Sequence, residues 1–330
     1  MTARIEAESA SPYFSIVIPA YNEEDHIGSC LQSIFTLNYD SAKYEVIVVD
    51  NGSQDRSYEI ALNFDQAKVF QLLEGNVGAV RNHGAAQARG QILIFIDADC
   101  LMDEDWLNRA EQLINDWPNY VYGGGVKLPI DATWIETSWL LESKGQPTLP
   151  KHLIGASTVL STKLFWEING YNELVSSGED TDLHNRLTSN NSPVLIDHAL
   201  DVTHLGNAKT LMQFLQRQIW HSENYISNII QSVKDPVFLA TSVFIILPFF
   251  VLIQSIFLSS SNITIISLLS WGSIPFLLSL KRMSRSRYFT LNPINIFSIY
   301  VLDFIYLAGR SLGLLKGFFN LVRLHDFGSS

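Results

Sequence analysis

The fold is decided by three apolar stretches that each end in polar residues: 14–23 (FSIVIPAYNE), 44–53 (YEVIVVDNGS) and 91–99 (QILIFIDAD). Apolar runs of this length that are rich in Val and Ile predict buried β-strands. Helical patterns lie between them, and strands that alternate with helices predict a parallel sheet covered by helices on both faces. We therefore predict an α/β fold. Further predicted elements are helices at residues 25–37, 57–64 and 78–88 and a strand at residues 68–73.

Acidic and polar residues stand where the predicted strands end. Ligands of parallel sheets bind at the carboxyl ends of the strands, so the turns at residues 19–23, 50–53 and 97–99 are expected to meet at one edge. Asp97 and Asp99, with one residue between them, offer hard oxygen ligands to Mg²⁺ or Mn²⁺. A cation there would also offset the repulsion between carboxylates and a diphosphate. Asp99 alone is equally compatible with a helix cap or a turn.

Charge divides the chain into two unlike parts. The formal net charge is −11, but residues 1–235 carry −16 and residues 236–330 carry +5. An acidic first part argues against a nucleic-acid-binding surface, which needs a basic footprint. The 47% content of hydrophobic residues excludes a disordered chain. Two cysteines, Cys30 and Cys100, are too few for a disulfide framework and indicate a reducing compartment.

The membrane signal lies in the second part of the chain. Residues 237–280 contain no Asp, Glu, Lys, Arg or His. As a helix, these 44 residues would be about 66 Å long, whereas one hydrocarbon core takes about 30 Å. This length predicts two spans, at residues 237–258 and 263–280, joined at the polar run 259–262. A buried hairpin of a soluble protein is the alternative.

The orientation of these spans follows from the basic residues after the second one. Four basic residues within 281–287 belong on the cytoplasmic side, which places residues 1–235 there as well. A third apolar block, residues 294–323, carries Asp303 and Arg310, and a charge at the bilayer centre costs about 3 kcal/mol. We therefore expect an interfacial helix there, with a third span as the alternative.

Several motifs together resemble those of family 2 glycosyltransferases with the GT-A fold. They are residues 14–23, 50–55, 76–84 and 97–99 and, further along, Gly178-Glu179-Asp180. The resemblance covers most of residues 14–230. It implies transfer of a sugar from a nucleotide-diphosphate donor with inversion at the anomeric carbon. A Gly-x-Gly-x-x-Gly fingerprint does not follow the first strand, which argues against a dinucleotide-binding domain.

The resemblance also implies roles for individual residues. Asp180 is expected to be the catalytic base, with Glu179 beside it. Asp99 is expected to bind the metal, with Asp97 near the ribose and the metal, and His204 is expected to be a third metal ligand. The residues expected to bind the nucleotide sugar are Pro19, Tyr21, Glu23, Asp50, Gly78, Arg81, Asp97 and Arg217.

Three of these assignments keep a structural alternative. Asp180 opens a helical pattern and is also a good N-terminal cap. As a base, it is expected to have a pKa raised by its cluster with Glu179 and Asp182. Arg81 is equally compatible with an arginine on a helix surface. His204 is a lone histidine, and such residues are more often structural than ligating.

Two alternatives to a simple sugar transferase stay open. Processive polysaccharide synthases of the family show Gln-x-x-Arg-Trp near residues 216–220, but this chain has Gln-Arg-Gln-Ile-Trp there. Transfer of a single sugar is therefore favoured, and Arg217 either faces the diphosphate or is a solvated helix residue. The second alternative is a non-catalytic, membrane-bound sugar-binding protein on the same fold. The presence of Asp97, Asp99, Glu179 and Asp180 together argues against it.

The predicted organisation has three parts: a disordered lead-in over residues 1–13, a cytoplasmic GT-A catalytic domain over 14–235 and a membrane domain over 236–330. The catalytic domain divides into a nucleotide-sugar half (14–128) and an acceptor half (129–235). The expected cofactor is Mg²⁺ or Mn²⁺. The expected partners are a nucleotide sugar, most often a UDP-sugar, a lipid-linked or glycan acceptor used in glycan or polysaccharide assembly, and membrane lipids. No nucleic acid is expected.

Overall fold

The computed structural model describes residues 12–143, 145–175, 177–226, 229–233, 235–257 and 261–327. Most of the predicted lead-in, and residues 258–260 between the two predicted spans, therefore lie outside the described residues. The chain forms two compact units. One comprises residues 1–129 and 146–206, and the other comprises residues 130–145 and 207–330.

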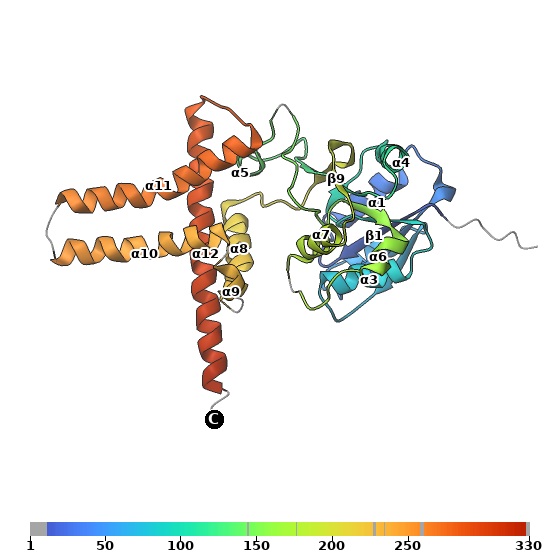
Figure 1. The fold of residues 1–330 in the computed structure, drawn as a ribbon. Coiled ribbons are helices and arrows are strands. Elements are labelled where there is room, and N and C mark those ends of the chain that lie inside the picture. Colours follow the sequence, from blue (N-terminus) through green and yellow to red (C-terminus); the bar gives the residue numbers. More distant parts are fainter. Residues whose placement is uncertain are drawn as a thin grey trace, which may run out of the picture. The chain divides into compact units, whose positions relative to one another are not determined.

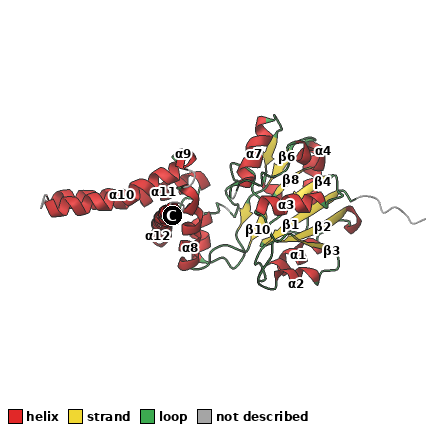
Figure 2. Cartoon of the chain, turned by 90° about the horizontal axis from the view of Figure 1, so that it is seen from below, coloured by secondary structure: helices red, strands yellow, loops and turns green. Residues whose placement is uncertain are grey.

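The first unit is built on a sheet of seven strands: β1 (Phe14–Ala20), β2 (Tyr44–Asp50), β3 (Ala67–Gln71), β4 (Ile92–Phe95), β6 (Val121–Gly123), β8 (Thr158–Ser161) and β9 (Val194–Ile196). Their order across the sheet is β3-β2-β1-β4-β8-β6-β9 (Figure 2). β1 runs parallel to β2 and β4, and β2 runs parallel to β3. β8 is antiparallel to β4 and β6, and β9 is parallel to β6. The predicted α/β fold with a mainly parallel sheet is confirmed.

Helices cover both faces of this sheet (Figure 1). They are α1 (Ile27–Phe35), α2 (Ser57–Leu62), α3 (Val77–Ala86), α4 (Trp106–Asp116), α6 (Thr162–Glu167) and α7 (Glu179–Ser189). Side chains of α1 and α4 share one apolar cluster with Ile16 and Ile18 of β1. Side chains of α3, α6 and α7 share a second cluster with Val17. Because successive strand residues point to opposite faces, β1 is buried on both sides.

Apolar spacing and capping explain where the helices begin. Ile27, Leu31 and Ile34 of α1 are buried at helical spacing. α3 begins after Asn76, whose side-chain oxygen accepts a hydrogen bond from the backbone N–H of Ala79 (3.0 Å). Both helices lie where the sequence predicts them. α1 is two residues shorter at each end, and α3 begins one residue earlier and ends two residues earlier than predicted.

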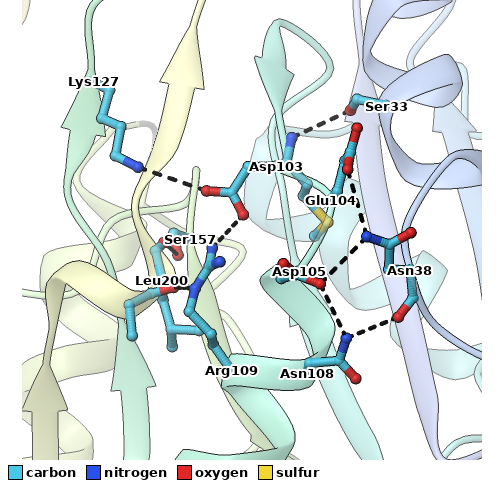
Figure 3. A network of polar contacts seen from close by, with 12 residues as sticks. Ser33, Asn38, Asp103, Glu104, Asp105, Asn108, Arg109, Lys127, Ser157 and Leu200 are labelled. Atoms are coloured by element: carbon cyan, nitrogen blue, oxygen red, sulfur yellow. Dashed lines mark hydrogen bonds and ion pairs between the residues drawn. The ribbon is translucent and has the colours of Figure 1, made fainter.

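A second, three-stranded sheet, with the order β5 (Cys100–Leu101), β10 (Val202–His204) and β7 (Val126–Lys127), carries part of the candidate site. Polar contacts around α4 support it (Figure 3). Arg109 of α4 donates from Nε to the carbonyl oxygen of Ala199 (2.7 Å) and also pairs with Asp103. Lys127 Nζ lies 3.7 Å from the same Asp103 carboxylate. The network therefore ties β7, and the segment that leads into β10, to α4.

The second unit is helical, with α5 (Trp134–Leu140), α8 (Leu211–Ser222), α9 (Ile229–Ser232), α10 (Pro236–Phe257), α11 (Ser261–Ser286) and α12 (Pro293–Phe327). The sequence pattern predicts one helix over residues 211–231, but α8 ends at Ser222 and a 3-10 turn, Glu223–Tyr225, follows it. Two windows, Pro236–Ile253 and Pro293–Phe319, are long and apolar enough to cross a membrane. That statement rests on their length and composition alone.

Glycines let α12 approach α8 closely. Gly309, Gly313 and Gly317 recur every fourth residue, and a Cβ at position 313 would lie 2.0 Å from Ser222 Oγ. The boundary predicted at residue 235 lies inside this unit, because α8 packs against α12.

A buried ion pair joins α11 to α12. Arg282 donates from Nε to Asp303 Oδ1 (3.0 Å), and Ser279 Oγ donates to Asp303 Oδ2 (2.6 Å). A buried carboxylate is costly unless it is paired and hydrogen-bonded. The unfavourable charge that the sequence places in the third apolar block is therefore paired within the protein.

Candidate active site

Asp50 ends β2 and is buried at the carboxyl edge of the sheet. Its Oδ2 accepts hydrogen bonds from the backbone N–H groups of Gly52 (3.1 Å) and Ser53 (3.2 Å). Its Oδ1 is buried without a hydrogen-bond partner among the described residues. A buried acceptor without a partner costs free energy. Oδ1 is therefore suited to accept a hydrogen bond from a ligand.

Three predicted nucleotide-sugar ligands lie at the end of β1: Pro19 in the strand itself, and Tyr21 and Glu23 in the turn that follows it. Because β1 pairs with β2 up to its last residue, this turn lies beside Asp50. The backbone N–H of Glu23 donates to Ser57 Oγ (2.6 Å), which ties the turn to the start of α2. The side chain of Tyr21 is 54% exposed, so its ring is accessible to a ligand at this edge.

Arg81 of α3 is buried and joins two carboxylates. Its Nη2 donates to Asp97 Oδ1 (2.7 Å), and its Nη1 donates to Glu179 Oε1 (2.6 Å). Asp97 follows β4 and Glu179 begins α7, so the guanidinium links the edge of the sheet to the N-terminus of that helix. With only 3% of the side chain exposed, the alternative of a helix-surface arginine is wrong.

Gly155 and Tyr171, which are not among the predicted site residues, define the space around Arg81. A Cβ at Gly155 would lie 2.0 Å from Arg81 Nη2, so only glycine leaves room for the guanidinium. The ring centroid of Tyr171 lies 5.3 Å from Arg81 Cζ, a cation–π arrangement. The sequence signal at the first position is only a run of small residues, 155–157, and at the second there is none.

Asp99 and His204, which are far apart in sequence, come together on the small sheet. His204 of β10 lies opposite Cys100 of β5, and its Nε2 is 3.1 Å from Asp99 Oδ2. With the Cys100 thiol they form a group whose ligand atoms all lie within 4.8 Å of one another. A Cβ at Gly206 would lie 2.0 Å from Asp99 Oδ2, so this glycine leaves room for the carboxylate. The group could hold a divalent cation.

The three members of this group differ as ligands. Burial raises the pKa of the Cys100 thiol well above its ordinary value, and a protonated thiol is a poor ligand. Carboxylate oxygen and imidazole nitrogen also suit Mg²⁺ or Mn²⁺ better than a soft thiolate does, and metal binding by Asp99 and His204 stays a prediction. Asp97, the other predicted ligand, is bonded to Arg81, and its contact with a metal stays a prediction.

Asp180 is the second residue of α7. Gly178, with a φ of 81°, occupies the N-cap position. Asp180 is therefore not the N-cap residue, although it lies in the first turn of the helix. Its Oδ1 accepts a hydrogen bond from the backbone N–H of Thr181 (2.7 Å).

The surroundings of Asp180 favour its protonated form. Burial raises the pKa of Asp180, and the charge of Glu179 adds to the rise. Asp182, which was expected to contribute, instead pairs with Arg186 Nε at 2.7 Å. The expected rise is thus present, with burial as its main cause.

Gly78 and Arg217 complete the predicted set. Gly78 of α3 is buried, and a Cβ there would lie 3.4 Å from Tyr171 Cβ, so packing accounts for a small residue. Arg217 belongs to α8 of the second unit. The contacts of both residues with a nucleotide sugar stay predictions.

We expect Gly155→Ala to lower kcat/KM by on the order of a hundredfold, because the new methyl group displaces Arg81 and misplaces both of its carboxylate partners. Sugar transfer and thermal unfolding should be measured together. Gly28→Ala is the control, because its Cβ would meet only Ile60 Cγ2 at an ordinary 3.5 Å. Wild-type kinetics for Gly155→Ala would show that the position of Arg81 is unimportant.

Known proteins resemble the first part of the chain in sequence. Residues 15–163 match the family model described as Glycosyl transferase family 2. The glycosyltransferase AglE of Haloferax volcanii is 40% identical over 124 residues, which are 36% of this chain and 41% of that protein. The dolichyl-phosphate beta-glucosyltransferase of Drosophila melanogaster is 39% identical over 128 residues, 33% of this chain and 39% of that protein. The chain thus matches about two fifths of the length of these relatives.

A solved structure shares the fold. The mannosyltransferase PcManGT from Pyrobaculum calidifontis, in complex with GDP-Man and Mn²⁺, superposes with a TM-score of 0.56 at 16% identity, over 92% of this chain and 87% of that chain. At this identity the likeness concerns the fold alone. With the motifs and the sheet order, these matches lead to one conclusion: residues 15–163 resemble a glycosyl transferase family 2 domain, and the chain has an α/β fold that resembles that of GT-A glycosyltransferases.

Proposed function

We propose that the protein is an inverting glycosyltransferase that moves a single sugar from a nucleotide-diphosphate sugar, most often a UDP-sugar, to a membrane-associated acceptor. The observation that carries this proposal is that Arg81 makes two salt bridges, one with Asp97 and one with Glu179. These contacts form a network. It joins the edge of the sheet, where GT-A ligands bind, to the acidic start of α7. Asp180, a carboxylate with a raised pKa, follows directly and supplies a proton acceptor there.

The donor nucleotide is proposed to lie against Asp50 and Tyr21. The Oδ1 atom of Asp50, which has no partner among the described residues, would accept a hydrogen bond from a base N–H. Uracil and guanine both offer one, so this contact fits a UDP-sugar or a GDP-sugar. The exposed ring of Tyr21 would cover the base or the ribose.

Asp99 and His204 are proposed to hold the divalent cation. The Asp99 carboxylate oxygen and the His204 imidazole nitrogen lie 3.1 Å apart. This ligand pair suits Mn²⁺. If phosphate oxygens filled the remaining coordination positions, the site would also suit Mg²⁺. The bound cation would neutralise the charge that develops on the departing diphosphate. The Pyrobaculum mannosyltransferase structure is a complex with Mn²⁺, which supports this choice.

Asp180 is proposed to take the proton of the acceptor hydroxyl while its oxygen attacks the anomeric carbon. The attack comes from the face opposite the diphosphate, so the configuration inverts. Arg81 holds Glu179 through a charge-assisted hydrogen bond and thereby orients the start of α7 that carries Asp180. The roles of Glu179 and Arg81 are therefore to position the base.

The acceptor is proposed to be held at a membrane, as a lipid-linked saccharide or another glycolipid. The apolar windows of α10 and α12 support membrane association. A relative whose name specifies dolichyl phosphate supports a lipid-linked acceptor. The four basic residues within 281–287 support a cytoplasmic catalytic unit.

The test is release of nucleotide diphosphate from a panel of UDP- and GDP-sugars by membranes that carry the protein, with Mn²⁺ or Mg²⁺ and with EDTA. We expect release from one donor class, dependent on acceptor lipid and lost with EDTA. Folded protein that releases no nucleotide from any donor would favour a non-catalytic sugar-binding protein. Products that lengthen on one acceptor would favour a processive synthase.

A further inference from the structure

α10 and α11 lie side by side as a helical hairpin (Figure 1). Trp271 Nε1 of α11 donates to the carbonyl oxygen of Phe244 in α10 (3.0 Å), and the two rings stack with centroids 4.9 Å apart. α10 contains no charged residue. Its exposed side consists of large apolar side chains, among them Val243, Ile246, Phe250 and Ile253. A helix of this kind is stable when lipid or protein covers its exposed side.

α12 runs crosswise to this hairpin in both views (Figures 1 and 2). At the crossing, Tyr300 Oη donates to the carbonyl oxygen of Gly272 (3.2 Å), and the ring of Phe304 lies 5.3 Å from that of Trp271. Two helices that cross cannot both follow the normal of one bilayer. The two windows that are long enough to span a membrane, in α10 and α12, are therefore alternatives.

The open side of α12 is an apolar stripe that runs along the helix on both sides of the crossing. Its exposed members recur at helical spacing and are Ile294, Phe297, Leu312, Leu315 and Phe319. Their exposed fractions range from 45% to 71%. We call these five residues the α12 stripe.

Three charged side chains of α12, in the part whose side chains the structure describes, contact other segments of the unit. Asp303 pairs with Arg282 of α11. Arg310 Nη1 donates to Tyr225 Oη (2.9 Å), and Lys316 Nζ donates to a carboxylate oxygen of Glu223 (2.6 Å). Contacts with protein therefore satisfy these charges, and the α12 stripe is left open. The stripe is thus the part of α12 that lipid or another protein must cover.

Basic residues at the end of α11 indicate what covers the stripe. Lys281, Arg285 and Arg287 are exposed, next to Arg282, which pairs with α12. Each exposed basic residue near an anionic bilayer surface adds about 1 kcal/mol of attraction. A second copy of the same positively charged surface would be repelled. The charge thus favours an anionic lipid surface over self-association.

We propose that α12 lies in the plane of the membrane, with the α12 stripe on the acyl chains, while the α10–α11 hairpin enters the hydrocarbon core. From Phe244, at the crossing, to Phe257, α10 advances about 20 Å, most of the way through a core of about 30 Å. On this arrangement α12 is not a span, although its length and composition would allow one. The proposal rests on the membrane association in the proposed function but not on sugar transfer.

The experiment is a depth measurement on the full chain in vesicles of equal parts phosphatidylcholine and phosphatidylglycerol. Single cysteines replace Phe297, Leu312 or Phe319 in the stripe, and Ile246 or Ile253 in α10. A nitroxide is attached to each, and its collisions with oxygen and with a water-soluble nickel chelate give its depth. The native Cys30 and Cys100 are fully buried and do not compete for the label. A label at Lys163, whose side chain is 86% exposed, is the reference for full accessibility to water.

We expect one shallow depth, within about 5–10 Å of the headgroup boundary, at all three stripe positions. The α10 label should sink by about 10 Å between positions 246 and 253, at 1.5 Å per residue. A depth that changes steadily from position 297 to 319 would make α12 the span and overturn the proposal. So would water accessibility at every position, or dipolar broadening at the stripe, which would reveal a second copy there. Correct depths in a protein that releases no nucleotide would refute only the proposed function.

Discussion

Asp180→Asn is expected to lower the turnover number by roughly a hundredfold or more, the range for loss of a general base. The amide keeps the size of the carboxylate and can still accept a hydrogen bond from Thr181, so the start of α7 should persist. An amide cannot take the proton of an acceptor hydroxyl. Donor affinity should be nearly unchanged, because Asp50, Asp99 and Arg81 are left in place. Turnover, donor binding and thermal unfolding are the three measurements.

The pH dependence of the wild type should carry the signature of this carboxylate. Burial raises the pKa of Asp180 in the folded protein. The base must be ionised, so turnover should fall with decreasing pH at a higher pH than for an ordinary aspartate. In the window between the unfolded and folded pKa values, the folded state binds more protons than the unfolded state, so this group lowers stability as pH rises. Above that window, the buried and ionised Asp180 destabilises the folded wild type, and Asp180→Asn removes this destabilisation. The variant should therefore not unfold at a lower temperature than the wild type.

Asp182→Asn is the matched control for this prediction. It lies in the same first turn of α7 and also removes one negative charge, but its partner is Arg186 on the same helix. It should keep most of the turnover. If Asp180→Asn unfolds at a lower temperature and retains its turnover number, Asp180 is a structural residue of the helix terminus and the assignment of the base is wrong.

Asp99→Ala is expected to abolish sugar transfer and to weaken donor binding. The side chain faces His204 Nε2 at 3.1 Å and is the one carboxylate in their common ligand group. Without it, the negative charge of the diphosphate would lose the cation that offsets it. His204→Ala should cause a smaller loss, because a water molecule can replace a neutral imidazole ligand. In EDTA, Asp99→Ala and the wild type should bind the donor with equal affinity.

Asp103→Ala is the control for a lost carboxylate on the same side of the fold. Asp103 pairs with Arg109 and Lys127 in the network around α4 and lies outside the metal group (Figure 3). Its removal should affect stability more than turnover. Full turnover of the wild type after EDTA treatment would refute the metal assignment, whatever Asp99→Ala does.

The strands and the edge at which their ends meet are local properties that the sequence determines. β2 occupies Tyr44–Asp50, where the apolar run ends at an acidic residue, and β1 occupies Phe14–Ala20, within the predicted stretch 14–23. Runs of apolar, β-branched residues need burial on both faces, and a parallel sheet covered by helices provides it. Because parallel strands end at one edge, the sequence alone places Asp50 and Asp97 at a common site.

The contacts of each site side chain involve residues that are distant in the sequence, and only the tertiary structure decides them. Arg81 meets Glu179 across 98 positions, and the glycine that makes room for it, Gly155, carries no motif. His204 reaches Asp99 because β10 pairs with β5, a contact between two short strands without a periodic signal. The same holds for α12, whose composition permits a membrane span. Its crossing of the hairpin and the pairing of Asp303 with Arg282 are packing properties. Local patterns report which surface must be buried, whereas the partner that buries it is set by the long-range fold.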